Sequence, residues 1–207
     1  MAPPAAPPHF RFRRLRRREL PLPTPALAKF LIGKTLVREI SGKRLAGRIV
    51  ETEAYLTGDA ACHAFRGQTP RNKSLFLRPG HAYVYFIYGS SFMLNISSGE
   101  AGVGEGVLFR AVEPLIGTEQ MQRYRGTERV LDLARGPGRL AEAFDIDRSL
   151  DGVDLCAPGP LWLGTSVREP QRISESVRIG INVAADRVLR FYESGSPFVS
   201  GTRKLRE

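Results

Sequence analysis

The sequence predicts an α+β fold: a single domain with a largely antiparallel curved β-sheet flanked by helices, plus a disordered basic N-terminal arm. Three observations predict it. Several strand-like runs follow one another through short glycine turns, only a few segments have helical character, and the leading MAPPAAPP has no apolar periodicity. Neither an internal repeat nor a second linker interrupts the remainder. We therefore expect a flexible Pro/Arg-rich arm over residues 1–23 and one domain over residues 24–207.

The domain begins with a helix and a pair of strands. A helix is expected over Ala26–Ile32, because a threonine and a proline just before it fit the N-cap and the first helical position, and a glycine follows it. Strands are expected over Thr35–Glu39 and Gly47–Tyr55, joined through a Ser-Gly-Lys turn.

The rest of the domain contains a second hairpin, further strands and two helices. The run AYVYFIY is rich in strand-forming residues, and a Gly-Ser-Ser turn follows it. The expected elements, in chain order, are a strand over Ala82–Tyr88, its hairpin partner over Phe92–Ile96, a strand over Gly106–Val112, helices over Pro114–Arg125 and Gly138–Phe144, and a strand over Val188–Tyr192.

The chain is strongly basic. Its formal net charge is +10 and its isoelectric point is about 10.2. Residues 1–20 contain six arginines and one acidic residue, which is half of the net charge, so the body of the protein is only moderately basic. Such an excess favours an anionic partner, with nucleic acid ahead of a membrane surface. A solvated basic surface without a specific partner is the alternative.

The cysteine, histidine and hydropathy patterns indicate the cellular compartment and the cofactors to expect. Cys62 and Cys156 form neither a CxxC pair nor a disulfide framework, which favours a reducing, cytoplasmic location. The three histidines are scattered, so no structural zinc is expected. No apolar run approaches the roughly 20 residues of a membrane helix, and no apolar stretch after the first arginines resembles a secretory signal. We expect no membrane partner.

The segment GRIVETEAY carries the most informative polar residues. In a strand, alternate residues share a face, so Glu51, Glu53 and Tyr55 lie together, with Val50, Thr52 and Ala54 on the opposite face. The second face is apolar enough for the core. A solvated acidic face is the simple interpretation of the first, but the tyrosine beside two acids favours the wall of a pocket.

Other candidates are aromatic or basic. Tyr85 is a candidate stacking platform, and Tyr88, at a hairpin tip, is well placed as a wedge into a base stack. His63 precedes a long polar loop that supplies Arg66, Arg71 and Lys73, which either contact phosphates or are merely exposed. Arg110 lies in an otherwise apolar strand and needs a partner, which the acidic face of Glu51 and Glu53 can provide.

Taken together, these segments resemble the alkyladenine (3-methyladenine) DNA glycosylase family. The resemblance covers about residues 27–200. It depends on five ordered segments, RIVETEAY at 48–55, QTPRN at 68–72, YVYFIYG at 83–89, NISS at 95–98 and RFY…GSP at 190–197.

The resemblance implies a role for each matching residue. Glu53 matches the general base and Arg110 the arginine that helps to hold the attacking water, while the carbonyl of Ile179 matches a further water ligand. Tyr55, His63 and Tyr85 match the walls around a flipped base, and Asn95 matches a residue that discriminates against the guanine 2-amino group. Tyr88 matches the residue that intercalates into DNA. The positions expected to contact the DNA backbone are Thr69, Arg71, Lys73, Arg125 and Arg139.

The implied activity is that of a monofunctional DNA glycosylase of base excision repair. It flips alkylated or deaminated purines from duplex DNA and hydrolyses the N-glycosidic bond with a Glu-activated water. None of the matched pocket positions is lysine, so no Schiff base and no lyase activity are expected. No metal and no cofactor are expected, and the protein is expected to act on double-stranded DNA with a damaged purine as a monomer.

Three alternatives stay open at the level of sequence. The first is a non-catalytic nucleic-acid-binding module whose acids are solvated. The second is a glycoside hydrolase of sugars that uses Glu51 and Glu53 as an acid/base pair. The third is a fold relative that binds RNA without chemistry.

Overall fold

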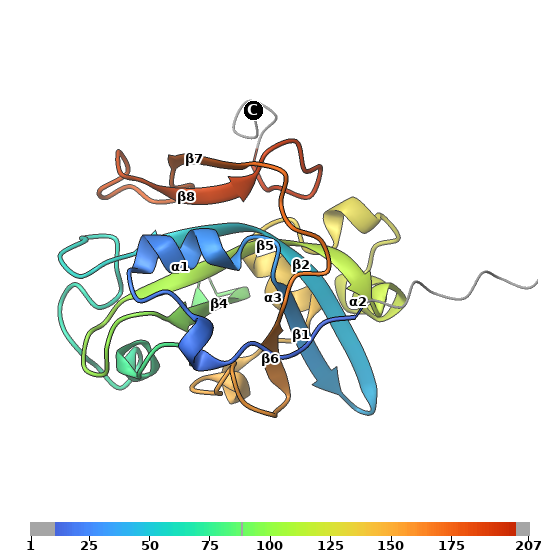
Figure 1. Cartoon of the computed structure of the whole chain (residues 1–207), viewed down its shortest axis with the longest axis horizontal. Helices are drawn as coiled ribbons and strands as arrows, with labels where there is room; N and C mark the ends of the chain where they lie inside the picture. The colour runs from blue at the N-terminus through green and yellow to red at the C-terminus, as the bar shows by residue number, and fades with distance from the viewer. Residues whose placement is uncertain (1–10, 88, 202–207) are drawn as a thin grey trace, which may run out of the picture.

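A computed structural model describes residues 11–87 and 89–201. Its helices and strands, shown in Figure 1, follow in chain order. They are η1 (Arg17–Glu19), α1 (Thr24–Leu31), β1 (Thr35–Ile40), β2 (Lys43–Tyr55), η2 (Lys73–Phe76), β3 (Ala82–Ile87), β4 (Ser91–Ser97), β5 (Gly106–Ile116), α2 (Thr118–Arg125), η3 (Val130–Asp132), α3 (Pro137–Ala143), η4 (Arg148–Leu150), β6 (Leu161–Gly164), β7 (Ile173–Val177) and β8 (Val188–Glu193).

The strands form one curled sheet. Within the described residues it has eight strands, with a main path β3-β4-β5-β2-β1-β6 and with β8 joining β7 to β2. All of its strand pairs are antiparallel. Strand β2 is central, because it pairs with β1, β5 and β8. The predicted α+β fold with a largely antiparallel curved sheet is confirmed.

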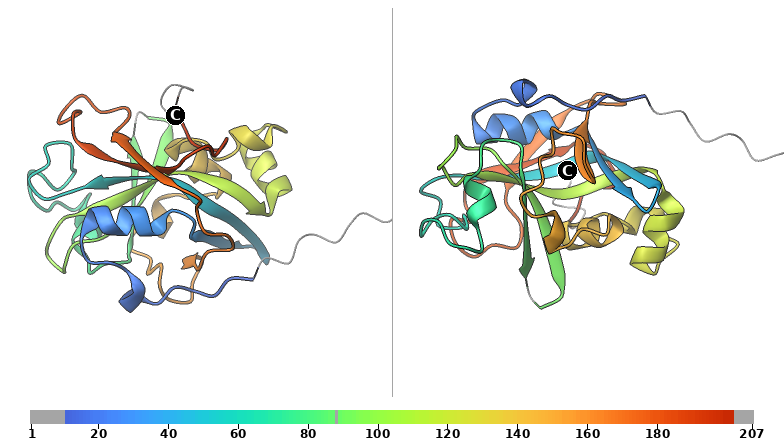
Figure 2. Two further views of the ribbon diagram at one scale, coloured as in Figure 1. Left: turned by 45° about the horizontal axis from the view of Figure 1, so that its top comes forward. Right: turned by 90° about the horizontal axis from the view of Figure 1, so that it is seen from below.

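The helices cover a continuous apolar core. Leu27 and Leu31 of α1, Phe109 of β5 and Leu140 of α3 belong to one cluster of buried side chains. The β3–β4 hairpin extends away from the rest of the sheet, as the right-hand view of Figure 2 shows. Both predicted hairpins form, and the turn between β1 and β2 has positive φ angles of 49° at Ser41 and 72° at Gly42. Two successive residues in this left-handed region are typical of a tight hairpin turn.

The pairing of β2 with β5 is irregular beside the acidic face. The register against β5 shifts on either side of Glu51, so strict alternation does not hold there. Thr52 bonds to the carbonyl of Ala28 in α1, as expected for the core side. Val50 instead packs in a small separate cluster with Tyr192. These shifts leave Val50 of β2 and Arg110 of β5 without a partner in the strand register, and Arg110 pairs with both Glu51 and Glu53.

The helix expected over Pro114–Arg125 is wrong in its first part. Strand β5 continues to Ile116 and pairs Pro114 with Gly47 of β2. A register shift beside Gly47 accommodates the proline, which has no N–H to donate. Gly117, with φ of 76°, then turns the chain into α2. Two short strands, β6 and β7, were not predicted, because a four-residue run and a polar edge strand give little periodicity.

The predicted flexible arm needs a correction over its second half. Residues 1–10 lie outside the described residues. The side chain of Leu15 is buried, its N–H donates to the carbonyl of Leu163 on β6 at 2.8 Å, and Arg17 pairs with Asp154 at 2.5 Å. Residues 11–23 therefore pack on the domain, since an apolar residue among the arginines reaches the core. Among the described helices, none has the length and apolar character needed to span a membrane.

Candidate active site

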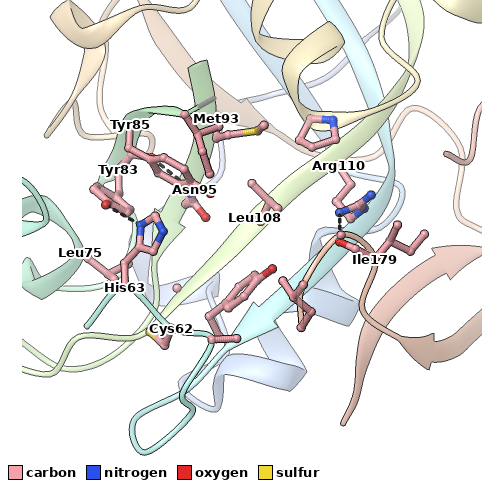
Figure 3. Close-up of a pocket in the computed structure, with 17 residues that line it drawn as sticks. Cys62, His63, Leu75, Tyr83, Tyr85, Met93, Asn95, Leu108, Arg110 and Ile179 are labelled. Carbon is pink, nitrogen blue, oxygen red and sulfur yellow. Dashed lines mark hydrogen bonds between the residues drawn. The ribbon is translucent and has the colours of Figure 1, made fainter. Parts of the chain in front are cut away.

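A cavity of about 240 Å³ opens between the β3–β4 hairpin, the loop after β2 and the segment after β7. Six residues singled out in the sequence line it together: Tyr55, His63, Tyr85, Asn95, Arg110 and Ile179. Figure 3 shows His63, Tyr83 and Tyr85 on one side, with Arg110 and Ile179 on the opposite side. Residues from four strands and two loops thus converge on one space, as a binding site requires.

Glu53 lies directly behind the wall of this cavity. Its side chain is completely buried in β2 and does not itself line the space. One carboxylate oxygen, Oε1, accepts the N–H of Ile179 at 2.8 Å and lies 3.1 Å from Nη1 of Arg110. The other, Oε2, accepts the hydroxyl of Tyr55 at 2.9 Å. All three partners line the cavity, so the carboxylate is one layer of atoms away from it.

Arg110, on β5, connects both acids of β2. Its Nε donates to Glu51 at 2.8 Å, and its Nη1 points to Glu53 and to the carbonyl oxygen of Ile179, at 3.4 Å. Burial opposes the charge of Arg110, but the carboxylates of Glu53 and Glu51 outweigh it and raise the pKa of the guanidinium. The predicted pairing of Arg110 with the acidic face is confirmed.

Glu51 is fully engaged in holding other groups. It accepts hydrogen bonds from Nε of Arg110, from Nε of Arg190 at 2.7 Å, and from the N–H and hydroxyl of Ser200 at 2.6 and 2.9 Å. Burial opposes its ionisation, but the two arginines and the Ser200 N–H outweigh burial and lower the pKa of Glu51. Glu51 is thus an ionised anchor for Arg110, with no surface on the cavity.

The aromatic side of the cavity is a packed cluster. The His63 and Tyr85 rings lie 4.3 Å apart, edge to face, and Nδ1 of His63 lies 2.9 Å from the Tyr83 hydroxyl. Desolvation by the cavity wall, and then the charge of Arg71, lower the pKa of His63, so the imidazole is neutral at pH 7. Neutral rings around an open space provide faces for a planar aromatic ligand.

Asn95 and several apolar side chains complete the lining. The side-chain amide of Asn95, on β4, donates to the main-chain carbonyl of Tyr83 at 3.2 Å, which fixes its orientation. Leu75, Met93 and Leu108 also face the space, so its wall is predominantly apolar. A mostly apolar cavity with few polar groups is typical of a site that binds a flat organic ring.

The expected DNA-backbone residues fall into two groups. Thr69, Arg71 and Lys73 are exposed, and Arg71 donates to the carbonyl of Phe86 on the β3–β4 hairpin at 3.2 Å, which places their loop beside that hairpin. Arg125 is partly buried and is engaged by Glu142 and by the carbonyl of Leu133. Arg139 is about half exposed and lies 3.5 Å from Asp132. Tyr88, the expected intercalating residue, lies outside the described residues.

Some residues of the site were not assigned roles from the sequence. Tyr83 contacts His63, and its place two residues before Tyr85 in a strand was a signal that both share a face. Arg178 and Asp59 form a buried ion pair beside the cavity, and no local pattern joins positions so far apart in the chain. Phe86, 46% exposed on β3, does not line the cavity and packs against Phe92.

This fold and site are those of a hydrolase class: a buried carboxylate lies behind an aromatic cavity that Arg110 lines and a basic loop flanks, an arrangement suited to the cleavage of an N-glycosyl bond. The chain belongs to the family described as Methylpurine-DNA glycosylase (MPG), whose sequence model matches residues 19–197. It is therefore a DNA repair glycosylase, a hydrolase of N-glycosyl bonds that acts on DNA.

Relatives from several bacteria and archaea share most of the chain. A protein of Mesorhizobium japonicum named "Putative 3-methyladenine DNA glycosylase" is 62% identical over 191 residues, covering 92% of each chain. Proteins with the same name from Paraburkholderia phytofirmans and Methanoculleus marisnigri are 50% and 46% identical, and the matches cover 92% and 86% of this chain and 90% and 93% of the relatives. The family resemblance inferred from the sequence is confirmed.

Proposed function

We propose that this protein, acting as a monomer, flips a damaged purine out of duplex DNA into the cavity and hydrolyses its N-glycosidic bond with a water that Glu53 activates, leaving an abasic site. One observation carries the proposal. The Glu53 carboxylate contacts Arg110 and the N–H of Ile179, and Arg110 in turn donates to the carbonyl of Ile179. Both Arg110 and Ile179 lie on the wall of the aromatic cavity.

Base flipping is proposed because the cavity can reach the glycosidic bond only of a base that has left the duplex. A base within the duplex hides its glycosidic bond, and extruding it costs a few kcal/mol. Stacking on His63, Tyr85 and Tyr55 offsets that cost, because base–aromatic stacking contributes about 1–3 kcal/mol per base. The exposed Arg71 and Lys73 lie on the loop beside the projecting hairpin. Contacts between these side chains and the DNA backbone phosphates would add salt-dependent affinity for DNA.

Glu53 supports the chemistry in two ways. Departure of the base leaves positive, oxocarbenium character on the sugar, which a nearby carboxylate stabilises. The same carboxylate accepts a proton from the attacking water. Arg110 and the Ile179 carbonyl provide one donor and one acceptor next to Glu53, which is the set of partners that would orient a water molecule.

Water reaches Glu53 only if one of its present contacts is exchanged. The Tyr55 hydroxyl, the Ile179 N–H and Arg110 together cover the carboxylate. Burial, and then the charge of Glu53, raise the pKa of Tyr55, so its neutral hydroxyl is a donor and not a competing charge. It is the contact that a water replaces with the least loss, since the other two donors belong to a charged side chain and to the main chain.

The proposed substrates are alkylated and deaminated purines. An N3- or N7-alkylated purine is already cationic and leaves readily, whereas neutral hypoxanthine needs a proton, so faster release is expected for the cationic bases. No described residue that lines the cavity is a lysine, which supports hydrolysis by water without a Schiff base or a lyase step.

The sugar-hydrolase alternative loses its acid/base pair. Glu51 would have to protonate a leaving group or attack a sugar, but it carries four hydrogen bonds, is completely buried and has a lowered pKa. An acid catalyst in such a pair has a raised pKa and reaches the substrate. The nucleic-acid-binding alternatives without chemistry give no reason for a buried carboxylate beside the cavity, since burying a charge is costly.

The test is single-turnover release of 7-methylguanine, 3-methyladenine, hypoxanthine and ethenoadenine from duplexes that each contain one lesion. Glu53→Gln is expected to lower the rate by about 100-fold or more, because general-base catalysis contributes about 10²–10⁴. Glu175→Gln, a change in an exposed ion pair with Lys29, is the matched control and should keep the native rate. Release at the native rate by Glu53→Gln would reject the assignment.

A further inference from the structure

The position of Ile179 is central to the site, although no regular secondary structure fixes it. Ile179 follows β7 in an irregular segment, and Ile179, Gly180 and Ile181 line the cavity. Its N–H binds Glu53 and its carbonyl accepts from Arg110. Both main-chain groups of one residue therefore contact the catalytic pair, and their placement depends on what anchors the segment.

The anchor is the neighbouring Arg178. Its side chain is completely buried and forms a two-point ion pair with Asp59, of which the Nη2–Oδ1 contact is 3.0 Å. It also donates to the carbonyls of Ala54 and Ala184, each at 3.1 Å, and its guanidinium lies 4.6 Å from the centre of the Tyr55 ring. One side chain thus joins the end of β2, the segment after β7 and a wall of the cavity.

Asp59 extends this connection to the opposite wall. It lies in the loop after β2, accepts the Ala61 N–H on its carboxylate at 3.1 Å and accepts the Cys62 N–H on its main-chain carbonyl at 2.8 Å. Cys62 and His63 line the cavity. Burial opposes its ionisation, but the hydrogen bonds from Arg178 and Ala61 outweigh burial and lower the pKa of Asp59.

We infer that Asp59 and Arg178 are positioning residues: their ion pair fixes the distance between the two walls of the cavity and holds Ile179 against Glu53. The inference rests on the proposed function of that site. For stability alone a buried ion pair is a weak device, since packed apolar side chains in its place are often as stabilising. A planar, two-point pair defines an orientation that apolar packing does not.

The functional consequence is a loss of rate that exceeds any loss of stability. Displacing a reacting group by about 1 Å costs on the order of 100-fold in rate. Without the Asp59 carboxylate, Arg178 loses its ion pair. The segment with Ile179 is then expected to shift, and its contacts to Glu53 and Arg110 are expected to lengthen. Thr69, Arg71 and Lys73, the expected DNA-backbone contacts, are exposed, and Arg71 is held by the carbonyl of Phe86, so binding of undamaged duplex is expected to be retained.

The experiment compares Asp59→Asn with Glu193→Gln. Glu193 pairs with the buried Arg48, with side-chain exposures of 5% and 0%, and neither residue lines the cavity. The two variants thus break ion pairs of similar burial at different places. Three quantities are measured for each: the single-turnover rate of base release, the affinity for undamaged duplex, and hydrogen–deuterium exchange of the peptide over residues 178–184, which leaves out the strand β7 that pairs with Glu193.

Asp59→Asn is expected to release base about 10–100-fold more slowly, to exchange faster at residues 178–181 and to bind undamaged duplex as the native protein does. Glu193→Gln should change neither the rate nor the exchange of that peptide. Equal rates for the two variants, or unchanged exchange at residues 178–181 in Asp59→Asn, would overturn the inference.

Arg178→Lys is the second variant, because it keeps the charge and loses the two-point geometry. It should also release base more slowly while keeping more of the rate than Asp59→Asn. If neither variant folds, the pair serves stability and the inference is wrong. If the native protein releases no base from any lesion, the proposed function fails, whereas the exchange of residues 178–181 still decides whether the pair holds that segment.

Discussion

Glu51→Gln tests the interpretation of Glu51 as a buried anchor. The change keeps the shape of the side chain and removes its charge. Around it, Glu51 and Glu53 balance Arg110 and Arg190, so the variant leaves one uncompensated positive charge in a fully buried cluster. Breaking a buried pair in this way costs about 3–5 kcal/mol, because the remaining charge has lost its partner.

The size of the effect follows from the four hydrogen bonds that Glu51 accepts. The glutamine amide has one acceptor oxygen and two N–H donors, so at least one of the four donors faces another donor. We expect a loss of about 3–5 kcal/mol in the free energy of unfolding. In a protein of this size, 1 kcal/mol shifts Tm by about 2–4 °C, so Tm falls by about 6–20 °C.

The pH dependence gives a second readout with a defined sign. The pKa of Glu51 is lower in the folded protein than in the unfolded chain, so its stabilisation is fully present above the unfolded carboxyl pKa of about 4.3. That stabilisation is lost as the pH falls through the lower, folded pKa. The difference in stability between the native protein and Glu51→Gln should therefore be largest near neutral pH and shrink in acid.

The assay is urea unfolding at a series of pH values, with Glu175→Gln as the control. Glu175 pairs with Lys29 at 2.6 Å, and both side chains are 44% exposed. An exposed pair contributes about 0.2–1 kcal/mol, so this variant should be nearly as stable as the native protein. If Glu51→Gln costs no more than Glu175→Gln at neutral pH, the anchoring role of Glu51 is refuted.

Three further predictions use other sites. Leu15→Ala should cost about 2–5 kcal/mol in unfolding free energy, because Leu15 is buried; a cost near zero would return residues 11–20 to a flexible arm. Gly47→Ala should cost about 1–3 kcal/mol, since its Cβ would lie 2.7 Å from Val112, whereas Gly159→Ala, with open space around it, should cost almost nothing. Tyr55→Phe should keep the single-turnover rate within about tenfold, because in the proposed reaction a water takes over the hydrogen bond of this hydroxyl to the Glu53 carboxylate; a loss as large as that of Glu53→Gln would show that the hydroxyl takes part in the chemistry.

The elements that the sequence predicts well are those with strong local signals. The β1–β2 and β3–β4 hairpins follow from glycine-containing turns between β-rich runs. Helix α1 forms where its proline predicts it, but Thr24 is not its N-cap: Pro23 is, and the Thr24 hydroxyl bonds Ser98 and Glu105 instead. The continuation of β5 through Pro114 does not follow, because pairing with a bulged partner strand outweighs a local preference for helix. The short β6 and β7 are strands only because β1 and β8 provide partners.

The residues of the site also divide into those with a local sequence signal and those without one. The sequence predicts that Glu51 and Glu53 share a face and that Arg110 needs an acidic partner, and the fold pairs Arg110 with both acids. Pairs between distant loops do not follow from local pattern, and Asp59 with Arg178 is the main example. Arg125 shows a further limit of prediction from sequence: it is expected to contact DNA, but in the fold its side chain pairs with Glu142. Burial and partner choice are properties of the folded chain.

The bonds between Ser200 and Glu51 make the support of Arg110 depend on residues far from β2 in the sequence. Ser200 donates twice to the carboxylate that orients Arg110, and Arg190 on β8 supplies the neighbouring charge. These groups reach Glu51 only when β8 pairs with β2, so the arginine of the site gains its full support only after strands far apart in the chain have assembled. A folding intermediate that pairs β2 with β5 alone would leave Glu51 without two of its three partner residues.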